Sequence, residues 1–421
     1  MIGRVLFLVL LVAKATFSQF SLDHFIGKAV ENSPTLKELA NLRSINRLQH
    51  KLNRAQNSAF QISLTGDYLF APYFNNHGDL ITTDPSPEAI GYDINLTDGG
   101  LYSAKINLER NILNGKLTGA LEDQIRIQDE NYQYSYDLEK HNLGKQVVDQ
   151  YLNALQLQWL IDLSKENVSN LREQVKLTSG LVEKGYLKAQ DYLLLKIEFN
   201  NQSIALDDAT QQYQSSLFQL YALCGMPDTS VAAIEPVTLR MGSPKIQSGF
   251  TRKYQLDSLT TVNGQQLFET RYWPQVKLFF NTGLEAVELS QIRRKFGMNA
   301  GLNISLPLFD GNQKSLTRQQ NLLARRTIQE SRSYSERTIG IQRKNFQSRI
   351  QSLQKSIIGL TEQVNDYKKL IEITSRQLQQ GNVSMIDYLT LLRNYVDLRK
   401  NKIGLEINFQ LEISNLNYWS W

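Results

Sequence analysis

Two long helical segments of equal length constrain the fold of this chain more than any other feature. Gly115 and Gly185 are 70 positions apart, and so are Gly311 and Gly381. Neither interval contains proline, and both place apolar residues at mixed steps of three and four, as an amphipathic helix does. A helix of this size is about 100 Å long, which exceeds an ordinary globular domain. A polar helix with a narrow apolar seam is stable only in a coiled coil or a helical array.

A repeated phrase follows both segments. Gly185 and Asp191 belong to a Gly–x5–Asp–Tyr–Leu phrase that returns 196 positions later with Gly381 and Asp387. Glycine suits the left-handed position that ends a helix. Ser384 and Asp387 form an S-x-x-D capping box at the start of a returning helix. We therefore predict two helical hairpins whose turns lie at a shared level.

Shorter helical segments complete each half of the chain. The first returning helix has Lys188 where a capping serine would stand, so its cap is expected to be weaker. Two further helical patterns each lead directly into a strand pattern. We expect the returning helices at 186–223 and 384–416, and the further helices at 33–59 and 251–271.

Four segments alternate apolar and polar residues with a period of two, which is typical of strands with one apolar face. Each has about ten residues, the length that a tilted strand needs to cross a bilayer. A soluble sandwich also alternates, but four strands alone cannot close a barrel, which needs about eight. Three chains would supply twelve strands and remove the exposed edges. The segments are 62–70, 104–112, 276–284 and 298–308, with exposed loops predicted at 75–99 and 288–295.

The amino terminus has the features of a secretory signal peptide. Arg4 precedes an apolar run that is too short to span a bilayer, and cleavage is predicted after Ala15 or Ser18. A membrane anchor is disfavoured because Lys14 interrupts the run. Cys224 is the only cysteine, so packing and oligomerisation must take the place of disulfides. The net charge of +5 on 421 residues indicates no nucleic acid partner.

Further motifs accompany these patterns: AVENSPTLKELA at 29–40, WPQVKLFF at 273–280 and ISLPLFDGN at 304–312. With the signal peptide and the two Gly–x5–Asp phrases, they resemble the TolC-like family of outer-membrane efflux proteins over essentially the whole mature chain. PLFDG and the tip phrases are the most specific parts. The resemblance implies an α+β fold: long antiparallel helical hairpins in a coiled-coil tunnel, plus four membrane strands per chain that complete a trimeric twelve-stranded barrel.

The resemblance also implies an organisation and a function. A signal peptide at 1–18 precedes a first structural repeat at 19–224, an equatorial connector at 225–250 and a second repeat at 251–421. The implied protein is a passive exit duct of a tripartite efflux or type I secretion system, in the outer membrane of a Gram-negative bacterium and extending into the periplasm. Its implied partners are two further copies in a homotrimer, outer-membrane lipid, a periplasmic adaptor (membrane fusion) protein and an inner-membrane pump, with no cofactor.

Four candidate functional residues follow from the same resemblance. Gly185, Asp191, Gly381 and Asp387 would lie at the hairpin tips that contact those partners. Asp387 matches a ring of aspartates at the tunnel entrance, where three carboxylates would attract cations and disfavour anions. Asp191 matches a position that helps to tie the hairpins closed. Helix capping is the alternative role for both carboxylates.

The chain departs from the family pattern at the tunnel entrance. Val383, Leu378 and Thr390 stand where relatives carry an arginine, a tyrosine and a second aspartate. The polar latch of the family is therefore largely missing, and we expect the entrance to close in another way.

Two other classes of function compete with the exit duct. A secreted periplasmic coiled-coil scaffold or adaptor without a channel would also use long helices, although the alternating strands and PLFDG argue against it. An enzyme is not indicated, because the chain has no nucleophile elbow, phosphate loop or CxxC motif. We predict neither catalytic residues nor a metal site, since no metal-ligand spacing relates the four histidines, His24, His50, His77 and His141.

Overall fold

The computed structural model describes residues 20–76, 78–84, 86–87, 90–93, 100–227, 230–243, 248–380 and 382–421. The predicted signal peptide and the second tip glycine, Gly381, lie outside the described residues. The chain forms two compact units. We call them the hairpin unit, which contains residues 135–251 and 334–421 and the amino-terminal part up to residue 38, and the sheet unit, which contains residues 39–134 and 252–333.

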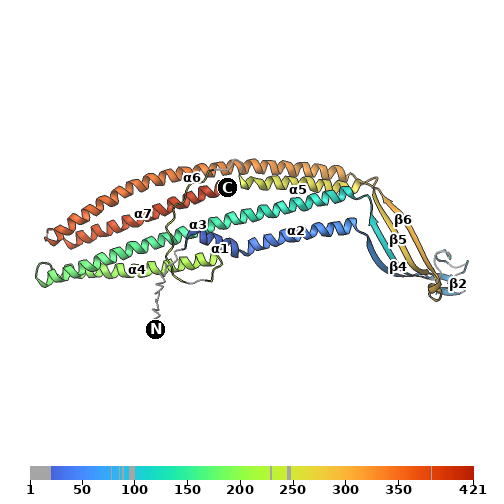
Figure 1. Cartoon of the computed structure of the whole chain (residues 1–421), viewed down its shortest axis with the longest axis horizontal. Coiled ribbons are helices and arrows are strands. Elements are labelled where there is room, and N and C mark those ends of the chain that lie inside the picture. Colours follow the sequence, from blue (N-terminus) through green and yellow to red (C-terminus); the bar gives the residue numbers. More distant parts are fainter. Residues whose placement is uncertain are drawn as a thin grey trace, which may run out of the picture. The chain divides into compact units, whose positions relative to one another are not determined.

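The predicted long helices and returning helices are confirmed (Figure 1). The two returning helices have 35 residues each, and both their first and their last residues are 196 positions apart. The two long helices also end 196 positions apart. The helices are α1 (Leu22–Asn32), α2 (Pro34–Ser58), α3 (Gly115–Glu183), α4 (Ala189–Leu223), α5 (Arg252–Glu269), α6 (Gln313–Gln379) and α7 (Met385–Trp419).

The hairpin unit is built around α1, α3 and α4. Helix α1 is an additional helix that precedes the predicted helix at 33–59. The two are separate because Ser33 ends α1 and Pro34 takes the first position of α2, where a missing backbone N–H costs nothing. Phe25 of α1 packs edge-on against Tyr151 of α3, and both are fully buried. The Tyr151 hydroxyl donates to the backbone carbonyl of Glu235 at 2.6 Å, which fastens the described part of the connector to this core.

The sheet unit contains the four predicted strands in one antiparallel sheet with the order β1-β4-β5-β6. The strands are β1 (Gln61–Phe70), β4 (Gly100–Asn111), β5 (Gln275–Ala286) and β6 (Phe296–Ser305). The last strand ends earlier than predicted, because Pro307 follows and cannot donate to a ladder.

The expectation of four strands in the whole chain is wrong. A second, two-stranded sheet pairs β2 (Tyr73–Asn76) with β3 (Asp79–Thr82), and it begins just before the segment predicted as an exposed loop and continues into it. Within the other predicted loop, Leu289–Arg294 forms a turn of 3₁₀ helix. Asn75, Asn76, Gly78 and Asp79 gather at the middle of the β2–β3 segment, and their turn-forming character concealed a hairpin there.

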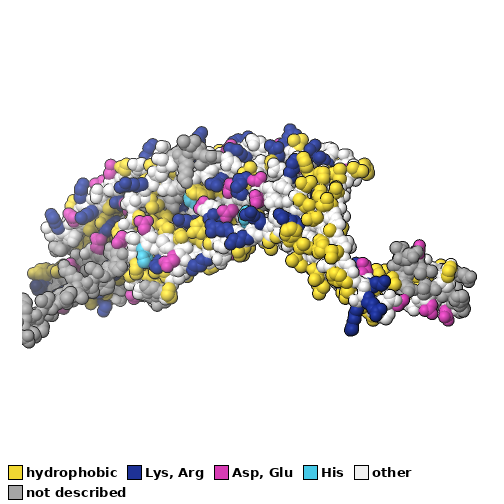
Figure 2. Space-filling model, turned by 45° about the vertical axis from the view of Figure 1, so that its right-hand side comes forward, with side chains coloured by type: hydrophobic (Ala, Val, Ile, Leu, Met, Phe, Trp, Pro, Cys, Tyr) yellow, Lys and Arg dark blue, Asp and Glu magenta, His cyan; other side chains and the backbone are white. Residues whose placement is uncertain are grey.

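The four-stranded sheet has one apolar and one polar face. The register aligns Ile62 with Leu108 and Leu108 with Phe280, so their side chains share a face. On this face Leu64 is 77% exposed and Met298 is 70% exposed, and Figure 2 shows hydrophobic side chains gathered over the strands. Such a large exposed apolar face marks a surface that contacts a membrane or another protein.

The opposite face of the sheet is held by polar cross-strand contacts. The Lys105 ammonium lies 2.6 Å from the Glu285 carboxylate, and Lys277 lies 2.9 Å from Glu109. Both pairs join β4 to β5, and opposite charges across an antiparallel pair stabilise its register. Among the described residues, none of the helices combines the length and the apolar character that a membrane crossing requires.

Candidate functional site

The first hairpin tip is closed by glycine, as predicted. Gly185 has a φ of 76°, in the left-handed region. Its N–H donates to the Val182 carbonyl at 3.0 Å, and the Tyr186 N–H donates to the Leu181 carbonyl at 2.9 Å. These two bonds form a Schellman motif, which satisfies carbonyls that the end of α3 would otherwise leave open.

Asp191 supports the start of the returning helix. Its carboxylate accepts a hydrogen bond from the Lys188 backbone N–H at 3.2 Å. The Lys188 side chain makes no capping bond, in agreement with the weaker cap expected there. Asp191 therefore has a local capping role, and its side chain is half-buried.

The second tip repeats the first closely. The Asn382 N–H donates to the Gln377 carbonyl at 2.9 Å. These two residues stand 196 positions after Tyr186 and Leu181, which form the corresponding bond at the first tip. Ser384 caps α7 by accepting from the Asp387 N–H at 3.2 Å. Its hydroxyl in turn donates to the Asp387 carboxylate at 2.6 Å.

Asp387 is thus the hydrogen-bond partner of the capping serine, and its carboxylate is exposed. One oxygen accepts the bond from Ser384, while the side chain stays on the surface of the tip. The helix amino terminus favours a negative charge at this position. The Ser384 hydroxyl supplies the cap, and the Asp387 carboxylate supports it while staying open to solvent.

An apolar cluster joins the two hairpins just behind the tips. It includes Leu378, which stands where the family carries a latch tyrosine and which is buried here. Burial also raises the pKa of the Tyr388 hydroxyl. We call this the tip cluster: Leu171, Leu195, Leu378, Met385, Tyr388, Leu389 and Leu392.

One ion pair lies beside the tip cluster, and no sequence pattern indicated it. The Arg393 guanidinium contacts the Glu198 carboxylate at 2.5 and 2.9 Å, joining α7 to α4. The Glu198 side chain is 4% exposed and that of Arg393 is 55% exposed. Gln202 donates to the other carboxylate oxygen at 2.9 Å. No local motif relates residues this far apart, so only the packing of the two hairpins reveals the pair.

The other two departures from the family latch supply no charge. Val383 is half-buried, and the Thr390 hydroxyl donates to the Ile386 carbonyl of its own helix at 2.8 Å. In the part of the chain that the structure describes, no group of three or more His, Cys, Asp or Glu side chains could hold a metal ion. The contacts that hold the two tips together are apolar packing in the tip cluster and the ion pair of Arg393 with Glu198.

The fold is that of known outer-membrane channels. A structure of CusC, described in terms of transmembrane channel formation, aligns with a TM-score of 0.74 at 12% identity, over 96% of this chain and 92% of that chain. The Campylobacter jejuni CmeC outer membrane channel aligns with a TM-score of 0.72 at 14% identity, over 95% and 85% of the two chains. The Vibrio cholerae outer membrane protein VceC aligns with a TM-score of 0.71 at 14% identity, over 95% and 96%.

These likenesses confirm the predicted TolC-like fold over almost the whole chain. No family model matches the sequence, and no curated protein matches it. At such low identity the shared property is the arrangement of helices and strands, since function depends on particular sites rather than on the fold.

Proposed function

We propose that this chain is the outer-membrane exit duct of a tripartite efflux or type I secretion system. It would conduct substrates passively across the outer membrane and the periplasm of a Gram-negative bacterium. The observation that carries the proposal is the sheet with a largely exposed apolar face, on a chain with the fold of outer-membrane channels. A lipid environment would cover that face, which water would disfavour.

The open edges of the same sheet support a homotrimer. In the described chain, β1 and β6 each have a strand on one side only. Open edges with an apolar face promote uncontrolled pairing unless another chain covers them. Helix α4 also exposes apolar side chains at Leu193, Ile197 and Ile204, where a neighbouring copy would pack. Three copies would join these edges and contribute twelve strands and the helical hairpins to one closed assembly.

The tips are the proposed contact sites for the periplasmic adaptor and the inner-membrane pump. The turns at Gly185 and Gly381 and the carboxylates of Asp191 and Asp387 belong to this surface. In a trimer, three Asp387 carboxylates would face one another at the entrance and would favour cations. The support is the exposure of Asp387 at the start of α7.

The test is the behaviour of the purified full chain in detergent and in a planar bilayer. We expect a trimer by mass measurement and stable ohmic conductance after reconstitution. A water-soluble, monodisperse chain that does not conduct would support the alternative, a secreted periplasmic scaffold or adaptor without a channel.

A further inference from the structure

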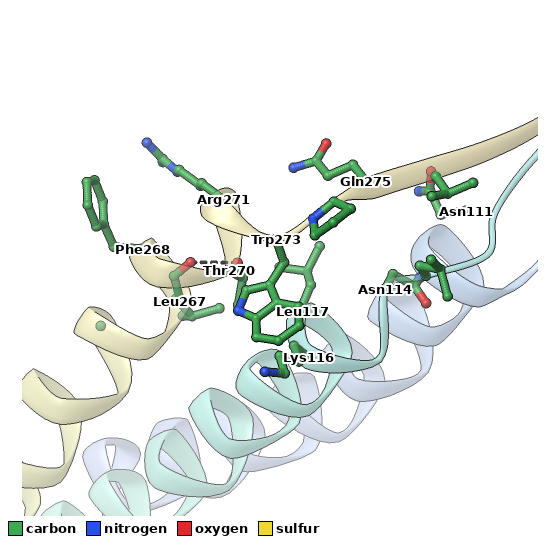
Figure 3. A pocket seen from close by; sticks show the side chains of 14 residues that line it. Asn111, Asn114, Lys116, Leu117, Leu267, Phe268, Thr270, Arg271, Trp273 and Gln275 are labelled. Atoms are coloured by element: carbon green, nitrogen blue, oxygen red, sulfur yellow. Dashed lines mark hydrogen bonds between the residues drawn. The ribbon is translucent and has the colours of Figure 1, made fainter. Parts of the chain in front are cut away.

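The junction between the helices and strands of the sheet unit contains a pocket of about 550 Å³. Its walls come from the end of β4 and the start of α3 on one side, and from the end of α5 and the start of β5 on the other (Figure 3). A volume of this size is typical of small-molecule sites. We propose that this pocket binds one anionic phospholipid, with the phosphate at its basic side chains and an acyl chain along its apolar wall.

The apolar wall of the pocket leads onto the exposed face of the sheet. Val276 lines the pocket, and the register pairs it with Ile304 on the face that also carries Leu278. Leu113 and Leu117 line the pocket from the other side, and Leu113 is exposed. An acyl chain that covers the apolar face could therefore continue into the pocket without crossing a polar surface.

The charge of the pocket selects an anion. Lys116 and Arg271 both line it, and none of its fourteen lining residues is Asp or Glu. Within the described chain, neither cation forms an ion pair with a carboxylate. Figure 3 shows these two side chains on opposite sides of Trp273, and an uncompensated positive charge at either side of the pocket attracts a phosphate group.

Aromatic rings hold both cations in place. The Lys116 ammonium lies 2.9 Å from the centre of the Trp273 ring, and Figure 3 shows Lys116 below that ring. The Arg271 guanidinium lies 5.4 Å from the centre of the Phe268 ring. A tryptophan beside a cation is typical of the boundary between membrane and water, because each has an apolar body and a polar tip.

The pocket lies between the two inner helices of the sheet unit. Arg43 of α2 pairs with Asp129 of α3, and Arg318 of α6 pairs with Glu269 of α5. The Asn263 side chain of α5 donates to the Ala120 carbonyl of α3. This order places α2 and α6 outermost, so neighbouring copies that dock there leave the pocket accessible to lipid. The proposal rests on the proposed function, because it requires the strands to lie in a bilayer.

The test is lipid retention by the full chain purified in mild detergent. The protein is mixed with equimolar phosphatidylglycerol and phosphatidylcholine of matched acyl chains, free lipid is removed, and retained lipid is quantified. We expect preferential retention of phosphatidylglycerol. Lys116→Gln should lower this retention about five-fold, and adding Arg271→Gln should lower it about five-fold again, since each charge near an anionic lipid contributes independently.

Two control variants make the result decisive. Lys196→Gln removes a cation 5.8 Å from the Tyr192 ring, outside the sheet unit, and should leave retention unchanged. Leu117→Trp fills the pocket and should lower retention of both lipids. Equal retention of the two lipids, or an equal loss in Lys196→Gln, would overturn the proposal. If inorganic phosphate alone displaced all of the bound phosphatidylglycerol, the pocket would be a phosphate site and not a lipid site.

The proposed function and the lipid site fail in different ways. A chain that conducts in planar bilayers but retains both lipids equally would refute the lipid site alone. A chain that neither conducts nor requires detergent would refute the proposed function, whichever lipid it binds.

Discussion

The two hairpin tips carry the same phrase in different surroundings. Two described backbone bonds correspond in their turns, those from Lys184 and Tyr186 at the first tip and those from Gln380 and Asn382 at the second, and the returning helices are equal in length. Leu389, however, is 5% exposed, whereas its repeat partner Leu193 is 54% exposed. Tyr388 is likewise buried, and its repeat partner Tyr192 is only half-buried.

The difference separates what a local phrase can specify from what it cannot. Turn and capping residues act on neighbours a few positions away, so the described backbone bonds of the two tips correspond. Burial depends on which helix lies opposite. The second hairpin contributes most of the tip cluster, while the first presents Leu193 to solvent or to another molecule. We infer that the second hairpin holds the tips together and that the first remains available for assembly.

The largest expected effect comes from disrupting the packing at the second tip. Leu389→Ala should destabilise the tip by about 2–5 kcal/mol, because it removes a buried side chain and leaves a cavity. Hydrogen exchange in residues 382–396 should therefore become faster. Leu193→Ala is the matched control and should leave exchange in that segment unchanged, since Leu193 is outside the tip cluster. Equal acceleration by both variants would contradict the difference between the tips.

The next largest effect comes from removing the ion pair between the returning helices α4 and α7. Arg393→Met leaves the buried Glu198 carboxylate without its cation and should cost about 1–3 kcal/mol, reduced from the value for a fully buried pair because Arg393 is half-exposed. Thermal unfolding followed by circular dichroism measures the loss. The double variant Arg393→Met with Glu198→Met should recover much of it, because no charge is then left buried. Additive losses would show that the two side chains do not act as a pair.

A smaller effect tests the glycine turn of the first tip. Gly185→Ala forces a side chain into the left-handed region and should cost about 1–2 kcal/mol. No heavy atom lies within 4 Å of the added Cβ, so the cost is conformational. Gly180→Ala, inside α3 and equally open, should instead stabilise by about 0.5–1 kcal/mol. Thermal unfolding of the two variants should therefore shift in opposite directions.

The smallest effect on stability concerns Asp387. Asparagine also caps helices, so Asp387→Asn should change stability by less than about 1 kcal/mol. If three copies ring the entrance, the same substitution should weaken cation selectivity and the block by multivalent cations in planar bilayers. Asp191→Asn, at the other tip, is the matched control. Unchanged selectivity in Asp387→Asn would restrict its role to the capping box.

Much of the fold could be predicted because its signals are periodic. Long proline-free segments, repeated glycines and alternating strands each bias the backbone directly, and the four strands of the large sheet were found this way. The β2–β3 hairpin was missed, since turn-forming residues concealed its short strands. Helix α1 was missed as a separate element, although Pro34 marked its boundary.

Less of the candidate site could be predicted. Capping by Asp387 follows from three residues of sequence, but its place at a pore entrance stays a prediction that rests on resemblance. The Glu198–Arg393 pair and the pocket beside Trp273 have no local signature. Each combines residues from helices or strands that are distant in the chain, and their chemistry exists only once those elements meet.

The sequence by itself determined the positions and lengths of the helical hairpins, the turn at Gly185 and the alternating faces of the strands. Each depends on interactions between residues a few positions apart. Only the tertiary structure decided that Leu389 is buried while Leu193 is exposed, and that Leu378 replaces a polar latch by apolar packing. The physical reason is that burial is a property of the opposing surface, and two identical phrases meet different surfaces when their helices pack against different neighbours.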